Sequence, residues 1–136
     1  MPYATAQSLI DRYGEPELVQ LADRDGDGGW EATVVDRVLA DTDAESDAAL
    51  AARYPLPLAT VPALLVGLAC DIARCRLHVD GVPDHVRDAA ANARKILAAL
   101  SAGTMSLGLP AASEPASTGL ARVSSGDAVF SSAEGF

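Results

Sequence analysis

The strongest constraint on the fold is the spacing of large apolar residues between positions 61 and 76. They recur every three or four positions, at Val61, Leu64, Leu65, Leu68, Ile72 and Cys75. This spacing places them along one face of an α-helix. The apolar run from Val61 ends at Asp71, well short of the roughly 20 residues that cross a bilayer. We therefore expect this segment to be the most buried helix of a protein that has no membrane partner.

Start and stop signals predict two short helices and one long helix before this segment. Thr5 is a candidate N-cap for a helix that Gly14 closes, and Pro16 lies in the first turn of the next one. A longer helix is predicted from Glu31 to about Ala52. Its second half is rich in alanine, which favours close approach of a neighbouring helix, at positions 44, 48, 49, 51 and 52.

A proline-rich connector and one further helix complete the predicted elements. The segment RYPLPLATVP (53–62) contains three prolines, which remove amide donors and extend the residues before them. We expect Thr60 to cap the buried helix and Asp80-Gly81 to end it. The last helix is predicted from Pro83 to Gly103.

These elements predict an all-α fold of about four to five helices in one small bundle. A chain of 136 residues fits one domain with one core. Because aromatic residues make up only 4% of the chain, we expect a core of Leu, Val, Ile and Ala. We assign residues 1–109 to this helical domain.

Residues 110–136 are predicted to form a flexible, extended C-terminal arm that becomes ordered on a partner. The segment contains six serines and lacks a helical period, so by itself it buries too little apolar surface to offset its ordering entropy. It nevertheless contains both phenylalanines of the chain, Phe130 and Phe136. Together with Val129 they are the predicted partner-binding residues, because aromatic rings supply large contact area at low entropic cost. The alternative is a solvated tail with incidental aromatics.

The charge balance argues against a nucleic-acid-binding protein. Ten basic and nineteen acidic residues give a net charge of −9, whereas affinity for a phosphate backbone comes largely from lysine and arginine. Five acidic residues follow one another along the long predicted helix: Asp36, Asp41, Asp43, Glu45 and Asp47. They form either a solvated face, or a surface that lines a lumen or meets a basic neighbour.

The sequence DRDGDGGWE (23–31) resembles half of a calcium-binding loop. Asp23, Asp25 and Asp27 occupy the first three ligand positions of an EF-hand, a glycine follows at the sixth, and Glu31 lies at the ninth. Position twelve, which needs a bidentate glutamate, is Val34. Any calcium binding should therefore be weak, and we expect no other cofactor. The alternative is a turn in which the aspartates accept hydrogen bonds from nearby amides.

No pattern in the chain predicts catalysis, and we expect a protein that is not an enzyme. The sequence contains none of the motifs GxSxG, HExxH or GxGxxG, and no phosphate-binding loop. The only histidines are His78 and His85. Cys70 and Cys75 are separated by about 140° around one helix, so we expect free thiols.

Two stretches resemble a known family: YATAQSLIDRYGEPELVQLADRDGDG (3–28) and LAARYPLPLATVPALLVGLACDIARCRL (50–77). They are similar to small proteins encoded among the head genes of Mu-like phages and prophages, a family of head-to-tail joining proteins of the neck. The resemblance covers roughly residues 3–109, and the final EGF (134–136) is similar to the ending of many members.

The resemblance implies an all-helical adaptor or head-completion subunit without enzymatic activity. Such subunits form a ring, typically of twelve copies, between the portal protein and a tail-side neck or tail terminator protein, and DNA passes through the lumen. The expected location is the virion, after assembly in the cytoplasm of the bacterial host, since no signal peptide is present. The alternative function is a small soluble calcium-binding or regulatory helical module that uses the loop at 23–34.

Overall fold

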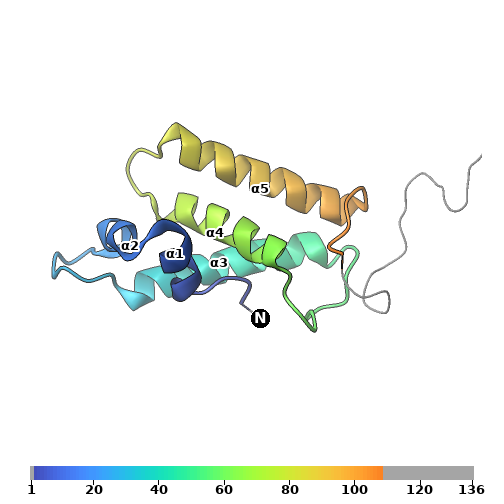
Figure 1. The fold of residues 1–136 in the computed structure, drawn as a ribbon, viewed down its shortest axis with the longest axis horizontal. Coiled ribbons are helices and arrows are strands. Elements are labelled where there is room, and N and C mark those ends of the chain that lie inside the picture. The colour runs from blue at the N-terminus through green and yellow to red at the C-terminus, as the bar shows by residue number, and fades with distance from the viewer. Residues whose placement is uncertain (1, 109–136) are drawn as a thin grey trace, which may run out of the picture.

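The computed structural model describes residues 2–108, and within them the chain forms five α-helices and no strand (Figure 1). The helices are α1 (Ala6–Tyr13), α2 (Glu15–Ala22), α3 (Ala32–Leu50), α4 (Ala63–Leu77) and α5 (Asp84–Ala102). The long helices α3, α4 and α5 pack against one another, and α1 pairs with α2 and also contacts α4. The predicted all-α bundle is confirmed.

Helix α4 lies at the centre of the bundle and is its most buried helix, as predicted. It contacts α1, α3 and α5. Seven of its fifteen residues are buried, and they are Leu65, Leu68, Ala69, Cys70, Ile72, Ala73 and Leu77. Burying a side chain the size of leucine contributes about 1.5–3 kcal/mol, so this helix supplies much of the apolar stabilisation of the bundle.

The N-terminal helix boundaries follow the predicted signals. The Thr5 side chain accepts a hydrogen bond from the amide of Ser8, and the Ser8 side chain accepts one from the amide of Thr5. This reciprocal pair satisfies two donors at the start of α1. Gly14 then joins α1 to α2 with φ of 92°, a left-handed value that favours glycine. Pro16 lies in the first turn of α2, as predicted.

The predicted cap of α4 is wrong. Its N-cap is Pro62, and Thr60 lies outside the helix. The proline ring disfavours helical backbone at Val61, so the chain stays extended until Pro62. The carbonyl of Pro62 accepts the first helical hydrogen bonds, from the amides of Leu65 and Val66 at 3.0 and 3.3 Å.

The prediction that alanines in α3 provide close packing is also wrong. Four of the five are exposed and Ala49 is half-buried. The buried face of α3 instead continues the helical period of its first turns, through Val35, Leu39, Thr42, Ser46 and Leu50. Thr42 is accommodated because its hydroxyl donates to the carbonyl of Val38 at 2.9 Å, which satisfies a polar group inside the core.

The two cysteines are free, as predicted. Cys70 is buried and Cys75 is half-buried. Burial raises the pKa of the Cys70 thiol to about 11, so this thiol stays protonated at neutral pH. In the part of the chain that the structure describes, none of the helices combines the length and the apolar character needed to span a membrane.

Candidate binding surfaces

The acidic loop between α2 and α3 is folded around its own aspartates. The Asp23 carboxylate accepts hydrogen bonds from the amides of Gly26, Asp27 and Gly28 at 2.9–3.1 Å. Asp25 accepts one from the Asp27 amide at 3.1 Å. These contacts are the aspartate-centred turn that the sequence offered as the alternative to a metal site.

The same turn gathers three carboxylates. Oxygens of Asp23, Asp25 and Asp27 all lie within 4.8 Å of one another. The Gly28 amide lowers the pKa of Asp23 below its ordinary value. The Asp27 amide acts in the same direction on Asp25, but desolvation and the Asp23 carboxylate outweigh it, so the pKa of Asp25 is raised. The pKa values of these two neighbouring acids are thus shifted in opposite directions, as expected when like charges share a site.

The second half of the loop offers less to a cation. Val34, at the position of the missing bidentate ligand, is half-buried and packs against the core. Glu31 has one carboxylate oxygen, Oε2, that is buried without a hydrogen-bond partner, while its amide donates to the carbonyl of Ala22 at 2.9 Å. The loop therefore brings together three of the four predicted ligands.

The five acidic residues predicted to form one face of α3 fall into three groups according to their contacts. Asp36 and Asp41 are exposed. Asp43 accepts a hydrogen bond from the amide of Tyr3 at 3.0 Å, and Asp47 accepts one from the Tyr3 hydroxyl. Burial raises the pKa of Asp43. These two acids therefore fasten the N-terminal segment to α3, which leaves fewer of them for a partner.

Glu45 forms the third group, with cations from other helices. It accepts hydrogen bonds from Arg94 of α5 at 2.6 and 3.2 Å and from Arg76 of α4 at 2.6 Å. Arg94, and to a smaller degree Arg76, lower the pKa of Glu45. Sequence reasoning missed both arginines because they lie 31 and 49 residues away along the chain.

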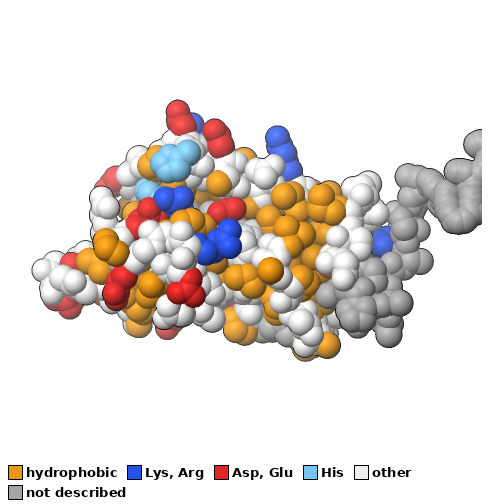
Figure 2. Space-filling view, in the orientation of Figure 1, with side chains coloured by type: hydrophobic (Ala, Val, Ile, Leu, Met, Phe, Trp, Pro, Cys, Tyr) orange, Lys and Arg blue, Asp and Glu red, His pale blue; other side chains and the backbone are white. Residues whose placement is uncertain are grey.

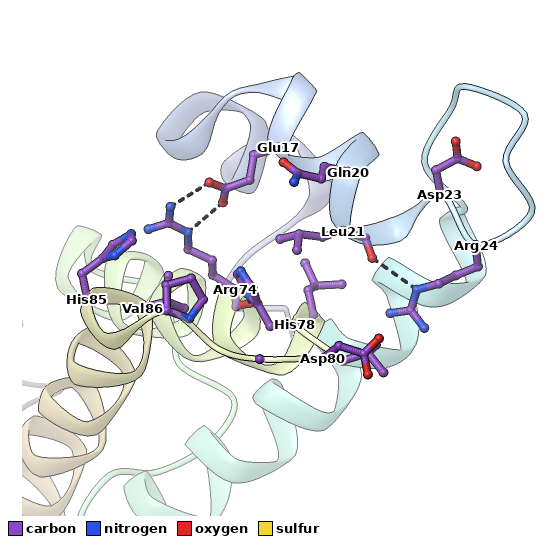
Figure 3. Close-up of a pocket in the computed structure, with 14 residues that line it drawn as sticks. Glu17, Gln20, Leu21, Asp23, Arg24, Arg74, His78, Asp80, His85 and Val86 are labelled. Carbon is purple, nitrogen blue, oxygen red and sulfur yellow. Dashed lines mark hydrogen bonds and ion pairs between the residues drawn. The ribbon is translucent and has the colours of Figure 1, made fainter.

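The sequence also gave no indication of a cleft of about 610 Å³ between α2, the end of α4 and the start of α5 (Figure 3). Both histidines line this cleft. Arg74 also lines the cleft, and its guanidinium donates hydrogen bonds to both carboxylate oxygens of Glu17 at 2.7 Å. The same guanidinium lies over the ring of Tyr13, 4.3 Å from the ring centroid. The Nδ1 atom of His78 lies 2.9 Å from the carbonyl oxygen of Arg74.

These contacts assign a structural role to Arg74. Glu17 raises the pKa of Arg74, and the pair fixes α2 against α4. The sequence does not predict the pairing of Arg74 with Glu17, because it shows only two opposite charges 57 residues apart. The predicted partner-binding residues Val129, Phe130 and Phe136 lie outside the described residues.

The fold and these surfaces define a small all-α protein with an internally bonded acidic loop, an acidic helix and a polar cleft. Comparison with known proteins gives the family. The chain belongs to the family described as Bacteriophage Mu, Gp36, whose model matches residues 3–125. This match extends beyond 109, into the segment predicted to be the arm.

Two relatives illustrate the similarity. The chain is 36% identical over 107 residues to the Mu-like prophage FluMu protein gp36 of Haemophilus influenzae, an alignment that covers 79% of this chain and 76% of that protein. It is 39% identical over 74 residues to gene product J of Escherichia phage Mu, covering 54% of this chain and 52% of that protein. The chain thus aligns with about half the length of gene product J.

Proposed function

We propose that this phage protein is a structural component of the virion, namely a head-to-tail adaptor subunit of the neck. In this proposal, identical subunits form a ring of about twelve copies between the portal protein and a tail-side neck or tail terminator protein. The observation that carries the proposal is the family match over residues 3–125 together with similarity to proteins of phage Mu and a Mu-like prophage.

Physical features of the chain suit this role. A closed ring uses two different surfaces on each subunit, and a subunit with a rigid helical core meets that need better than a flexible one. A net charge of −9 also suits a lumen through which DNA passes, because an acidic wall does not retain a polyanion.

Deleting the gene from the phage or prophage that encodes it tests the proposal. Induced cells should then accumulate DNA-filled heads that carry no tails, together with free tails, as seen by electron microscopy. Supplying the full-length protein in the same cells should restore tailed particles, and the protein should be found in purified virions by mass spectrometry. Normal tailed particles from the deletion strain would exclude the adaptor role.

A calcium-binding module is the second candidate, favoured by one observation. The three aspartates of the loop place carboxylate oxygens within 4.8 Å of one another. An observation against calcium binding is that the carboxylate oxygens of Asp23 and Asp25 already accept hydrogen bonds from backbone amides. Calcium affinity is the quantity that separates the two functions.

A further inference from the structure

Helices α4 and α5 contribute no charged residue to one end of the helical bundle. Helices α4 and α5 form an antiparallel pair, so α4 begins where α5 ends (Figure 1). The two segments that meet there, residues 54–70 and 96–108, contain no Asp, Glu, Lys or Arg, in a chain in which 21% of residues are charged. We call the surface formed by these two segments the uncharged end.

The uncharged end presents large apolar side chains to solvent. Leu64, in the first turn of α4, is 40% exposed, and Met105, just after α5, is 41% exposed. Figure 2 shows hydrophobic side chains gathered over the first half of α4 and the adjoining half of α5, whereas most of the charged side chains of this face lie toward the opposite end. Concentrated apolar surface on a soluble protein marks a binding site.

The chain itself provides a segment of matching chemistry. The described chain leaves the bundle at the uncharged end, where Leu107 is buried and its amide donates to the hydroxyl of Tyr54 at 3.1 Å. The segment that follows, 109–136, contains both phenylalanines of the protein. An uncharged surface favours these aromatic side chains, because a charged group would lose hydration there without gaining an opposite charge, so Glu134 between the two phenylalanines must stay in water.

We infer that residues 129–136 of one copy bind the uncharged end of a second copy. Twenty residues, 109–128, separate the last eight from the bundle. Fully extended, twenty residues span about 66 Å, enough to reach a neighbouring subunit. Donor segment and acceptor surface are different parts of one chain, so the contact is head-to-tail and can close into a ring. That this contact occurs in the neck of a phage particle rests on the proposed function, whereas the contact between two copies does not.

A peptide of residues 125–136 tests the contact directly. It is titrated into full-length protein that carries Phe130→Ser and Phe136→Ser, so that its own segment does not compete. Methyl NMR should show saturable shifts at Leu64 and Met105. Leu64→Asp combined with Met105→Asp should weaken binding at least tenfold. Val79→Asp is the matched control, because Val79 is 67% exposed in the loop at the opposite end of the α4–α5 pair and should leave binding unchanged.

Mixed copies of the full chain test whether the contact is made between subunits. A photoreactive phenylalanine analogue at position 130 is placed in light-isotope protein and mixed with heavy-isotope protein. Crosslinks from the light chain to segments 54–70 or 96–108 of the heavy chain support the inference. Crosslinks only within one chain, crosslinks to another surface, or a peptide that fails to bind would overturn it. Tailed particles from the deletion strain alongside positive binding would remove the adaptor role and leave this contact standing.

Discussion

At the scale of single residues, Glu45 connects three helices. Its carboxylate joins α3 to Arg76 of α4 and to Arg94 of α5, and its side chain is only 28% exposed. A carboxylate shared by two guanidinium groups is held more rigidly than an isolated surface pair. We therefore expect this network to contribute to stability even though most surface ion pairs do not.

Glu45→Gln should lower the free energy of unfolding by about 1 kcal/mol at pH 7. The arginines lower the pKa of Glu45 in the folded state, so its contribution is full above the unfolded pKa, about 4.3, and is lost as pH falls through the lower folded pKa. Urea titrations of both proteins should therefore converge under acid. Asp84→Asn is the control, because the Arg87–Asp84 pair is 59% and 86% exposed and should change stability by less than about 0.5 kcal/mol. If the difference in free energy of unfolding between the unmodified protein and Glu45→Gln stayed the same at acidic pH, this account would be contradicted.

The aspartates of the loop give a second prediction at this scale. Because Asp23 already accepts three amide hydrogen bonds and Val34 supplies no ligand, calcium should bind no more tightly than about 10⁻⁴ M. Calorimetric titration measures this directly, with Asp25→Asn as the variant that should abolish any residual heat. Sub-micromolar binding with a large gain in helicity would instead favour the calcium-binding module.

At the scale of elements, sequence periodicity located all five helices, and local chemistry fixed the ends of most of them. Thr5 acts through its side chain on a residue three positions away, and Gly14 and Gly103 act through their own backbone. All three are local effects that a sequence displays. The face that a helix buries is a tertiary choice, so α3 packs through Thr42 and Ser46 where alanine content suggested otherwise. The acidic residues of α3 were only partly interpreted for the same reason, because their partners are distant along the chain: Tyr3 precedes α1, and Arg76 and Arg94 lie on α4 and α5.

Gly67 provides a prediction for the junction of α1 and α4. A methyl group at this helical position would lie 3.3 Å from a terminal nitrogen of Arg12, the mobile end of an exposed side chain that can move by a few tenths of an ångström. Alanine is favoured over glycine inside a helix by about 1 kcal/mol. We expect Gly67→Ala to stabilise the protein by about 0.5–1 kcal/mol in thermal or urea unfolding.

Gly103→Ala is the opposite case and serves as the comparison. Gly103 ends α5 with φ of 84°, a left-handed conformation that costs other residues roughly 1–2 kcal/mol. Its replacement should destabilise the protein by about that amount. Destabilisation by Gly67→Ala of the same size would show that Arg12 is fixed in place and contributes to the junction of α1 and α4.

At the scale of the whole molecule, net charge predicts how the protein meets DNA. With a charge of −9, the free protein should not bind duplex DNA at about 50 mM salt, because few cations are available to displace counterions. Fluorescence anisotropy with a labelled duplex measures this. Micromolar affinity with a steep dependence on salt would contradict an acidic lumen.

Truncation separates the folded bundle from the segment proposed to join subunits. The hydrophobic core within residues 2–108 draws on all five helices and extends from Tyr3 to Leu107. If residues beyond 108 bind other copies, as inferred above, a chain that ends at Gly108 should keep its free energy of unfolding within about 0.5 kcal/mol while losing contact with other copies. Leu107→Ala in the full chain is the matched control and should cost about 2 kcal/mol, because it empties a buried site. If truncation lowered the free energy of unfolding as much as Leu107→Ala does, residues beyond 108 would pack into their own subunit. The uncharged end would then no longer be free for a neighbour.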